Sequence, residues 1–387
     1  MRVLTITSLF PRATDPSHGV FVLQRVKALA EAGAKVRVVS PLPWVPRGPL
    51  PERYVRLRKT PVEEKVRGLT VRHPRYRMLP LVGARWQARG YQKGVLPTVR
   101  EEVERFKPDI LDVHYLYPDG VAVGRIAAEV GLPYVLSARG SDVKVIARIP
   151  SLRLQIEEAL ERAAAVIAVS DDLAAEMRET KIHTGPIEVI PNGVDAEVFR
   201  PLDRAEARRE LSIDPADRFV VCVGRLTAVR GQALLIEALA SAKAPAGLRA
   251  FFVGEGPDEK SLKRSVARLG LGDRVRFVGT QDLSRIPLWL AAADGAVQLL
   301  SSAGSPNAVL EAVACRAPLL ASDIPAVREA LPDPERAVLV ELEPAAVARG
   351  LGQLLDAPPE PYAGPVRPWT EVAEEVLGVF RRVMDDR

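Results

Sequence analysis

The sequence is poor in the residues that hold metals and disulfides. Its 387 residues include two cysteines, Cys222 and Cys315, and four histidines that are scattered without the spacing of metal ligands. A disulfide framework and a zinc site are therefore not expected. No apolar run is long enough to span a bilayer, and the first strand begins without the layout of a secretion signal. These absences predict a cytoplasmic protein.

The length and composition indicate a globular chain with two domains, since 47% of the residues are hydrophobic and 27% are charged. Short strands rich in valine and isoleucine alternate with amphipathic helices along the whole chain. This pattern is typical of parallel sheets covered by helices on both faces. We expect an α/β protein with two doubly wound, Rossmann-like domains, 1–198 and 199–368. A last amphipathic helix within 369–387 should pack back on the first domain.

The net charge of +5 is unevenly distributed along the chain. Region 47–93 contains thirteen lysines or arginines and three glutamates, a local charge of +10. Aromatic and apolar residues accompany this charge at Trp44, Tyr54, Tyr76, Leu79, Leu81, Val82 and Trp86. The composition suits either a solvated basic lobe or a peripheral contact with the anionic inner face of the cell membrane. Nucleic acid, the other anionic partner, is not expected.

In open α/β sheets, ligands bind at the carboxyl ends of the strands, and several such ends in the second half carry suitable residues. In VGRLTAVRGQ (223–232), Arg225 and Arg230 precede a helix N-terminus and could cradle a diphosphate, although a solvated charge pair is the alternative. VGEGPDEK (253–260) lacks the third glycine of a dinucleotide fingerprint, so an NAD dehydrogenase is not indicated. VGTQD (278–282) could offer its backbone to a nucleobase.

A further strand end, 301–307, leads into a helix that carries Glu311. Ser305 and Asn307 lie at the start of this helix, where free N–H groups can bind phosphate or sugar hydroxyls. The apolar neighbours of Glu311 favour a buried and partnered carboxylate over an ordinary surface glutamate. Such a carboxylate could accept two hydrogen bonds from a ribose diol.

The first half has its own polar strand ends. The loop 8–22 contains Gly19, which lets the backbone approach a ligand closely. DVHYLYPDG (112–120) places His114 at a strand end, and SARGSDV (137–143) places Arg139 and Asp142 at the next. A single histidine in such a place is more often structural than catalytic, but several polar strand ends that converge favour a site.

Taken together, these motifs resemble the nucleotide-sugar-dependent glycosyltransferases of family 4, which have the GT-B architecture. The resemblance covers almost the whole chain and rests on the Gly19 loop, HYLYPDG, RGSD, Val169–Ser170, PNGVD (191–195), GRL-x3-RG, VGEGP and PNAVLEAVAC. It implies two Rossmann-like domains facing across a cleft. It also implies retaining transfer of a sugar from a UDP- or GDP-sugar to a glycan or lipid-linked acceptor, without a cofactor or an obligatory metal. The teichuronic-acid and exopolysaccharide branch is the most similar.

The same resemblance implies roles by position. Arg225 and Arg230 would neutralise the leaving diphosphate, and Glu311 would bind the donor ribose. The implied donor-binding set is Gly19, Arg225, Arg230, Gly254, Gly256, Thr280, Ser305, Asn307 and Glu311. The implied catalytic set, near the transferred sugar, is His114, Arg139 and Asp142.

Four positions depart from the family pattern. A Glu-x7-Glu pair is usual, but its first position is Ala303 here, so the carboxylate that would hold the donor sugar is missing. Arg316 replaces a glycine, at a cost of about 1 kcal/mol if its φ is positive. Arg230 replaces a lysine, and Arg139 replaces a frequent histidine.

Three alternatives therefore stay open. The first is an active transferase with altered donor contacts. The second is a catalytically impaired homologue that binds nucleotide or nucleotide-sugar without efficient transfer. The third, which the motif order disfavours, is another GT-B enzyme such as an epimerase or a disaccharide synthase.

Overall fold

The computed structural model describes residues 1–78 and 83–386, with only the backbone of Arg53. The chain forms two compact units: the first comprises Met1–Gly193 and Trp369–Arg387, and the second comprises Val194–Pro368. The sequence analysis placed this division at 198/199. Leu79, Leu81 and Val82 of the basic region lie outside the described residues. No helix within the described part of the chain is long and apolar enough to cross a membrane.

The first unit is built on an eight-stranded sheet with the order β10-β9-β8-β7-β1-β2-β5-β4. The strands are β1 (Arg2–Ile6), β2 (Lys35–Val39), β4 (Glu63–Val66), β5 (Leu69–Arg72), β7 (Ile110–His114), β8 (Tyr134–Ala138), β9 (Ala165–Ala168) and β10 (Glu188–Val189). Only the edge strand β4 runs antiparallel to its neighbour. A separate pair of short strands is formed by β3 (Leu42–Pro43) and β6 (Arg75–Tyr76).

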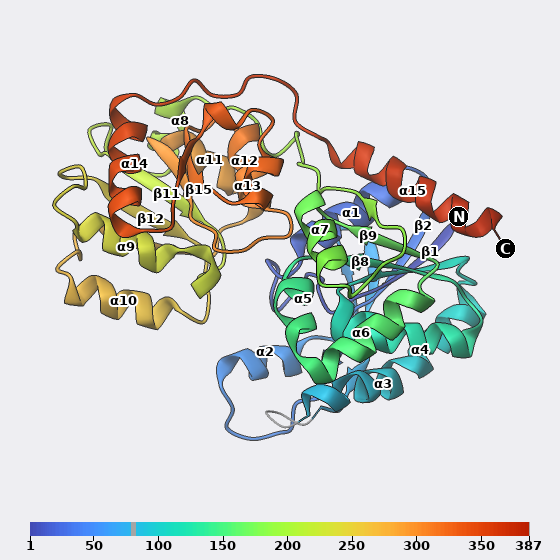
Figure 1. Ribbon diagram of the computed structural model, residues 1–387. Coiled ribbons are helices and arrows are strands. Elements are labelled where there is room, and N and C mark those ends of the chain that lie inside the picture. Colours follow the sequence, from blue (N-terminus) through green and yellow to red (C-terminus); the bar gives the residue numbers. More distant parts are fainter. Residues whose placement is uncertain (79–82, 387) are drawn as a thin grey trace. The chain divides into compact units, whose positions relative to one another are not determined.

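Helices cover both faces of this sheet (Figure 1). One face is covered by α3 (Ala84–Arg105), α4 (Val121–Val130), α6 (Pro150–Arg162) and α7 (Asp171–Glu179). The other face is covered by α1 (Val20–Glu31) and α15 (Trp369–Asp385), which pack against each other. The predicted return of the last helix to the first domain is therefore confirmed. Two further helices are short, α2 (Glu52–Lys59) and α5 (Ser141–Lys144), and Val143 of α5 joins the buried cluster beneath the first of these layers.

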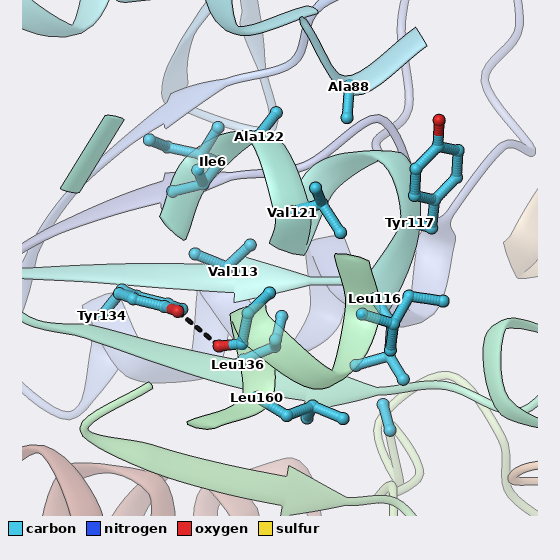
Figure 2. Close-up of a cluster of buried hydrophobic side chains, with 14 of the residues drawn as sticks. Ile6, Ala88, Val113, Leu116, Tyr117, Val121, Ala122, Tyr134, Leu136 and Leu160 are labelled. Atoms are coloured by element: carbon cyan, nitrogen blue, oxygen red, sulfur yellow. Dashed lines mark hydrogen bonds between the residues drawn. The ribbon is translucent and has the colours of Figure 1, made fainter. Parts of the chain in front are cut away.

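The core of the first unit is apolar because β1, β7 and β8 alternate their side chains between two helix layers. Ile6, Val113 and Leu136 contact the layer of α3, α4 and α6, and Figure 2 shows them together with Val121 of α4. The hydroxyl of Tyr134, buried in the same cluster, donates a hydrogen bond to the carbonyl of Ala159.

The second unit has a six-stranded, all-parallel sheet with the order β13-β12-β11-β14-β15-β16. The strands are β11 (Phe219–Val223), β12 (Arg249–Val253), β13 (Val275–Gly279), β14 (Gly295–Gln298), β15 (Leu319–Ser322) and β16 (Val338–Val340). Counted within the unit, this is the order 3-2-1-4-5-6 of dinucleotide-binding folds. The α/β class with two doubly wound sheets is confirmed.

Two helix layers also enclose the second sheet. The layer of α8 (Arg204–Glu210), α11 (Ile286–Ala292), α12 (Asn307–Ala314) and α13 (Pro325–Ala330) packs on Phe219, Val221 and Val223 of β11. The layer of α9 (Gln232–Ala240), α10 (Glu259–Arg268) and α14 (Pro344–Asp356) packs on Val220 and Cys222. Because successive side chains of β11 enter opposite layers, the strand is apolar throughout and buried on both faces.

Candidate active-site residues in the two units

Both sheets have a switch point, where the order of strands reverses beside the first strand of the unit. In the first unit β1 lies between β7 and β2, and in the second unit β11 lies between β12 and β14. Connections leave such a point in opposite directions, which opens a crevice outside the carboxyl ends of the strands. The polar residues selected from the sequence follow these strand ends.

In the second unit, the loop after β11 is fixed to the end of β14. The side-chain amide of Gln298 donates to the carbonyl of Val223 at 3.0 Å, and the backbone N–H of Ser301 donates to the carbonyl of Val229 at 3.0 Å. Arg225 stands exposed on this loop, whereas Arg230 is partly buried. The loop thus holds two guanidinium groups at the switch point, just before the N-terminus of α9.

Arg230 and Glu311 influence each other's charge at this site. Burial raises the pKa of Glu311 to about 7, and the positive charge of Arg230 opposes that rise. Burial lowers the pKa of Arg230, and the negative charge of ionised Glu311 works against this effect. Glu311 is partly buried rather than fully enclosed. The predicted partnership is therefore electrostatic, with Arg230 as the charge that favours ionised Glu311.

The glycines after β12 hold neighbouring loops close together. Gly254 has φ 138°, and a Cβ atom there would lie 2.2 Å from the carbonyl oxygen of Gly224. A Cβ atom at Gly256 would lie 2.1 Å from the carbonyl oxygen of Leu226. Both positions therefore require glycine for packing alone, and their predicted contact with a nucleobase stays a prediction. Thr280 is exposed after β13.

The segment that enters α12 differs from the family pattern in its chemistry. Ser305 and Asn307 are partly buried at the helix start, where the Asn307 N–H donates to the carbonyl of Ser305 at 3.1 Å. Ala303 is partly buried and packs against the apolar cluster beneath it. No carboxylate therefore stands at position 303 to bind a sugar hydroxyl.

Arg316 ends α12 in the left-handed conformation, with φ 54°. Its N–H donates to the carbonyl of Val313, and the N–H of Ala317 donates to that of Ala312, both at 3.0 Å. These two bonds form a Schellman motif, which usually has glycine at the position of Arg316. The strain expected for Arg316 at a positive φ is therefore present.

In the first unit, a chain of buried polar side chains crosses the ends of β7 and β8. Arg25 of α1 donates to the Ser137 hydroxyl at 3.0 Å and pairs with the Asp112 carboxylate at 3.4 Å. Asp112 also contacts the Nε2 atom of His114 at 3.0 Å, and Arg139 donates to the Nδ1 atom of the same ring.

These contacts determine the state of His114. The guanidinium of Arg139 can only donate hydrogen bonds, so the Nδ1 atom that it contacts carries no proton. The ring proton is therefore on Nε2, which donates to Asp112. Burial lowers the pKa of His114 to about 3, and Arg139 adds to this effect while Asp112 opposes it. Burial alone would raise the pKa of Asp112, but the hydrogen bond from the N–H of His114 and the positive charge of Arg25 hold it below its usual value. His114 is fully buried and uses both ring nitrogens, so it positions Arg139 and exposes no free nitrogen for catalysis.

Arg139 is the outermost member of this chain. Its second terminal nitrogen donates to the side-chain oxygen of Asn192 at 3.2 Å, and its guanidinium stacks over the Phe21 ring at 5.5 Å. Burial lowers the pKa of Arg139 to about 9, and the nearby charge of Arg25 contributes. The side chain remains a cation at neutral pH, held in one orientation.

Asp142 is fully buried and accepts hydrogen bonds from backbone N–H groups, two of them in its own loop. Its carboxylate accepts hydrogen bonds from the N–H groups of Leu116, Arg139 and Gly140 at distances between 2.7 and 3.1 Å. Burial raises the pKa of Asp142, and these backbone donors oppose the rise. The carboxylate therefore fixes the loop that carries Arg139, and a direct contact with sugar stays a prediction.

The DVHYLYPDG motif also contains two buried acids, Asp112 and Asp119, that were not selected from the sequence. Asp119 accepts from the backbone N–H and the hydroxyl of Ser8, and from the hydroxyl of Tyr91 at 2.9 Å. It thereby anchors the loop after β1, whose end is Gly19. Gly19 has φ 68°, and a Cβ atom there would lie 2.4 Å from the Leu9 backbone. Burial raises the pKa of Asp119 to about 7.

The fold and these strand-end clusters are those of an α/β enzyme with two doubly wound domains, and comparisons with known proteins identify its family. Residues 18–198 match the family model "Glycosyltransferase Family 4", and residues 203–363 match "Glycosyl transferases group 1". The teichuronic acid biosynthesis glycosyltransferase TuaC of Bacillus subtilis is 30% identical over 84% of this chain and 81% of its own length. The chain therefore belongs to the family 4 glycosyltransferases.

Solved structures share the fold over the full chain. A sucrose-phosphate synthase from Thermosynechococcus elongatus has a TM-score of 0.81 at 18% identity and covers 100% of both chains. Anabaena HepE in complex with UDP-glucose has a TM-score of 0.70 at 19% identity, over 100% of this chain and 99% of its own. At these identities the likeness confirms the GT-B fold. Within the described residues, no group of three or more His, Cys, Asp or Glu could hold a metal ion.

Proposed function

We propose that the protein transfers a sugar, with retention of configuration, from a UDP- or GDP-sugar to a glycan or lipid-linked acceptor. The observation that carries the proposal is the pair of cations, Arg225 and Arg230, at the switch point of the second sheet. That sheet has the strand order of dinucleotide-binding folds. The HepE structures with UDP and with UDP-glucose support a donor of this class.

The proposed chemistry follows from the charge that the donor releases. When the bond from sugar to phosphate breaks, negative charge grows on the departing nucleoside diphosphate. Arg225 and Arg230 would stabilise this charge together with the N-terminus of α9. Glu311 would accept hydrogen bonds from the ribose hydroxyls, because Arg230 favours its ionised form. None of these contributions needs a metal ion.

On the first unit, Arg139 is the proposed contact near the transferred sugar. Hydrogen bonds to His114 and Asn192 hold its guanidinium in one orientation, so the group is already ordered before a substrate arrives. Fixed cations of this kind stabilise developing charge without reorganisation. His114 and Asp142 are proposed to act through Arg139, as positioning residues, instead of meeting the substrate themselves.

Position 303 supports a second candidate, a homologue that binds nucleotide-sugar but transfers it poorly. Ala303 packs against apolar residues and leaves no carboxylate for the donor sugar. Under this candidate, Ala303→Glu would restore or redirect turnover. Under the leading proposal, other contacts hold the donor sugar, and the wild-type protein catalyses transfer without any substitution at position 303.

The acceptor is proposed to lie at the cytoplasmic face of the membrane. The charge of +10 in region 47–93 suits an anionic surface, where a lipid-linked acceptor would be found.

A turnover assay tests the transferase. Purified protein is incubated with UDP- and GDP-sugars and with polyprenyl-phosphate-linked or glycan acceptors, and the nucleoside diphosphate and the glycosylated product are quantified. The anomeric coupling of the product, measured by NMR, tests retention. Multiple turnover of one donor supports the proposal. Donor binding without turnover, rescued by Ala303→Glu, would favour the impaired homologue instead.

A further inference from the structure

Exposed apolar side chains of the first unit come from two segments that lie far apart in the sequence. In the basic region, Trp44 and Trp86 are 54% and 46% exposed. Around the start of α6, Val145, Ile149 and Leu154 are exposed, the last by 72%. Single exposed apolar residues are ordinary, but a group of them rimmed by charge marks an interaction surface.

The first turns of α3 connect the two segments. A Cβ atom on Gly90 would lie 2.1 Å from the carbonyl oxygen of Arg77, so the chain after β6 runs directly against α3. The guanidinium of Arg77 stacks over the Trp44 ring at 6.0 Å. From the other side, the side-chain amide of Gln155 on α6 donates to the carbonyl of Arg85 at 3.3 Å. Helices α3 and α6 contact each other, and Figure 1 shows them side by side.

Cations surround the tryptophans on this surface. Arg85 and Arg89 both lie over the Trp86 ring, at 5.0 and 4.9 Å from its centroid. With Arg77, they are exposed, and none of the three forms an ion pair with any carboxylate of the described residues. Arginines on α6 differ, since Arg153 pairs with Glu157 at 2.7 Å. Arginines without an ion pair therefore lie beside both tryptophan rings.

We propose that this surface docks the first unit on an anionic lipid bilayer by insertion of apolar side chains from both segments. Tryptophan is favoured at the boundary between headgroups and acyl chains, because its ring is apolar and its N–H is polar. Arginines beside the rings bind lipid phosphates. A nucleic acid would engage the arginines and the tryptophan rings but would gain little from Leu154 and Ile149. The inference extends the membrane contact proposed above from a charged region to a composite inserting surface.

Vesicle binding tests this surface independently of transfer. The full chain is floated with phosphatidylcholine vesicles that contain or lack phosphatidylglycerol. We expect binding to the anionic vesicles, weakened about fivefold or more by Leu154→Ala and by Trp86→Ala, since each removes an inserted apolar group. Leu269→Ala is the matched control, because Leu269 is 36% exposed in the second unit, and it should bind as wild type does. Nucleotide binding should be unchanged in Leu154→Ala, which separates this inference from the proposed activity.

Tryptophan fluorescence reports insertion directly. Of the four tryptophans, Trp289 and Trp369 are buried, so a change on vesicle binding arises at Trp44 and Trp86. We expect a blue shift and quenching by brominated lipid. Three results would overturn the proposal: no binding to anionic vesicles, binding without a blue shift, or unaltered binding by Leu154→Ala. Displacement of the vesicles by duplex DNA, with no effect of Leu154→Ala, would assign the surface to nucleic acid.

Discussion

Arg139 donates a hydrogen bond to the Nδ1 atom of His114, and this contact places the ring proton of a fully buried imidazole on Nε2. The ring is neutral at physiological pH and directs its proton to Asp112. This histidine, selected as catalytic from the sequence, uses both ring nitrogens in contacts with Asp112 and Arg139. Its consequences can be measured as a function of pH.

The first prediction concerns the stability of the protein in mild acid. The pKa of His114 is lowered to about 3, whereas an unfolded histidine titrates near its usual value of about 6.5. Between about pH 6.5 and pH 3, His114 is protonated in the unfolded chain but not in the folded chain. This histidine therefore destabilises the fold as pH falls. Relative to wild type, His114→Gln should gain about 2 kcal/mol of unfolding free energy between pH 7 and pH 5. Urea denaturation of both proteins at both pH values checks this. If the difference in unfolding free energy between variant and wild type were the same at pH 7 and pH 5, His114 would be protonated in the folded state.

Asp119 should show the opposite pH dependence. Burial raises its pKa to about 7, so the folded chain holds a proton that the unfolded chain has released above about pH 4. Its contribution to stability is full in acid and is lost as pH rises toward 7. Asp119→Asn should therefore be less destabilising at pH 7 than at pH 5, in the same denaturation series. An equal cost at both values would contradict the raised pKa.

Arg25 and Asp112 provide a test of the buried ion pair. Both side chains are almost completely inaccessible, with 3.4 Å between the charged atoms. Arg25→Ala leaves Asp112 without its strongest cation and should cost about 3–5 kcal/mol. Arg328→Ala, in an exposed pair with Asp323 at 2.5 Å, is the control and should cost less than about 1 kcal/mol. Similar costs for both variants would show that the buried pair contributes no more than a surface one.

Arg316 offers a stabilising substitution. Its φ of 54° is strained for a side chain with a Cβ atom, so Arg316→Gly should raise the stability by about 1 kcal/mol. The control is Arg264→Gly in the interior of α10, where the same change should cost about 1 kcal/mol. Thermal unfolding should show a higher unfolding temperature for Arg316→Gly and a lower one for Arg264→Gly, each relative to wild type. A loss of stability in Arg316→Gly would mean that the contact of its side chain with the Ala363 carbonyl outweighs the strain.

Much of the fold follows from local pattern. Strands β1, β7 and β11 are short apolar runs because they are buried on both faces, and such runs are visible without knowledge of any partner. The hairpin of β4 and β5 was missed. β4 reads Glu-Glu-Lys-Val and forms the exposed antiparallel edge, so its composition does not differ from that of a loop.

The site was predicted less completely than the fold. Strand-end loops were found because glycines and charged residues follow apolar runs. The roles inside them depend on partners from distant segments: Arg25 meets Asp112 across 87 positions of sequence. A polar residue within an apolar helix or strand is a signal of such a partner, but the sequence does not say which residue it meets.

The central claim is that the switch point of the second sheet binds a nucleotide-sugar through Arg225, Arg230 and Glu311. Calorimetric titration of the purified protein with UDP, GDP, ADP and their sugar conjugates tests it most directly. We predict that one nucleotide family binds, and that Arg225→Ala and Glu311→Ala each weaken binding by tenfold or more, about 1.4 kcal/mol. Arg264→Ala and Glu237→Ala, two exposed residues of the same unit, should bind as wild type does. Binding of no nucleotide, or equal binding by all four variants, would contradict the account.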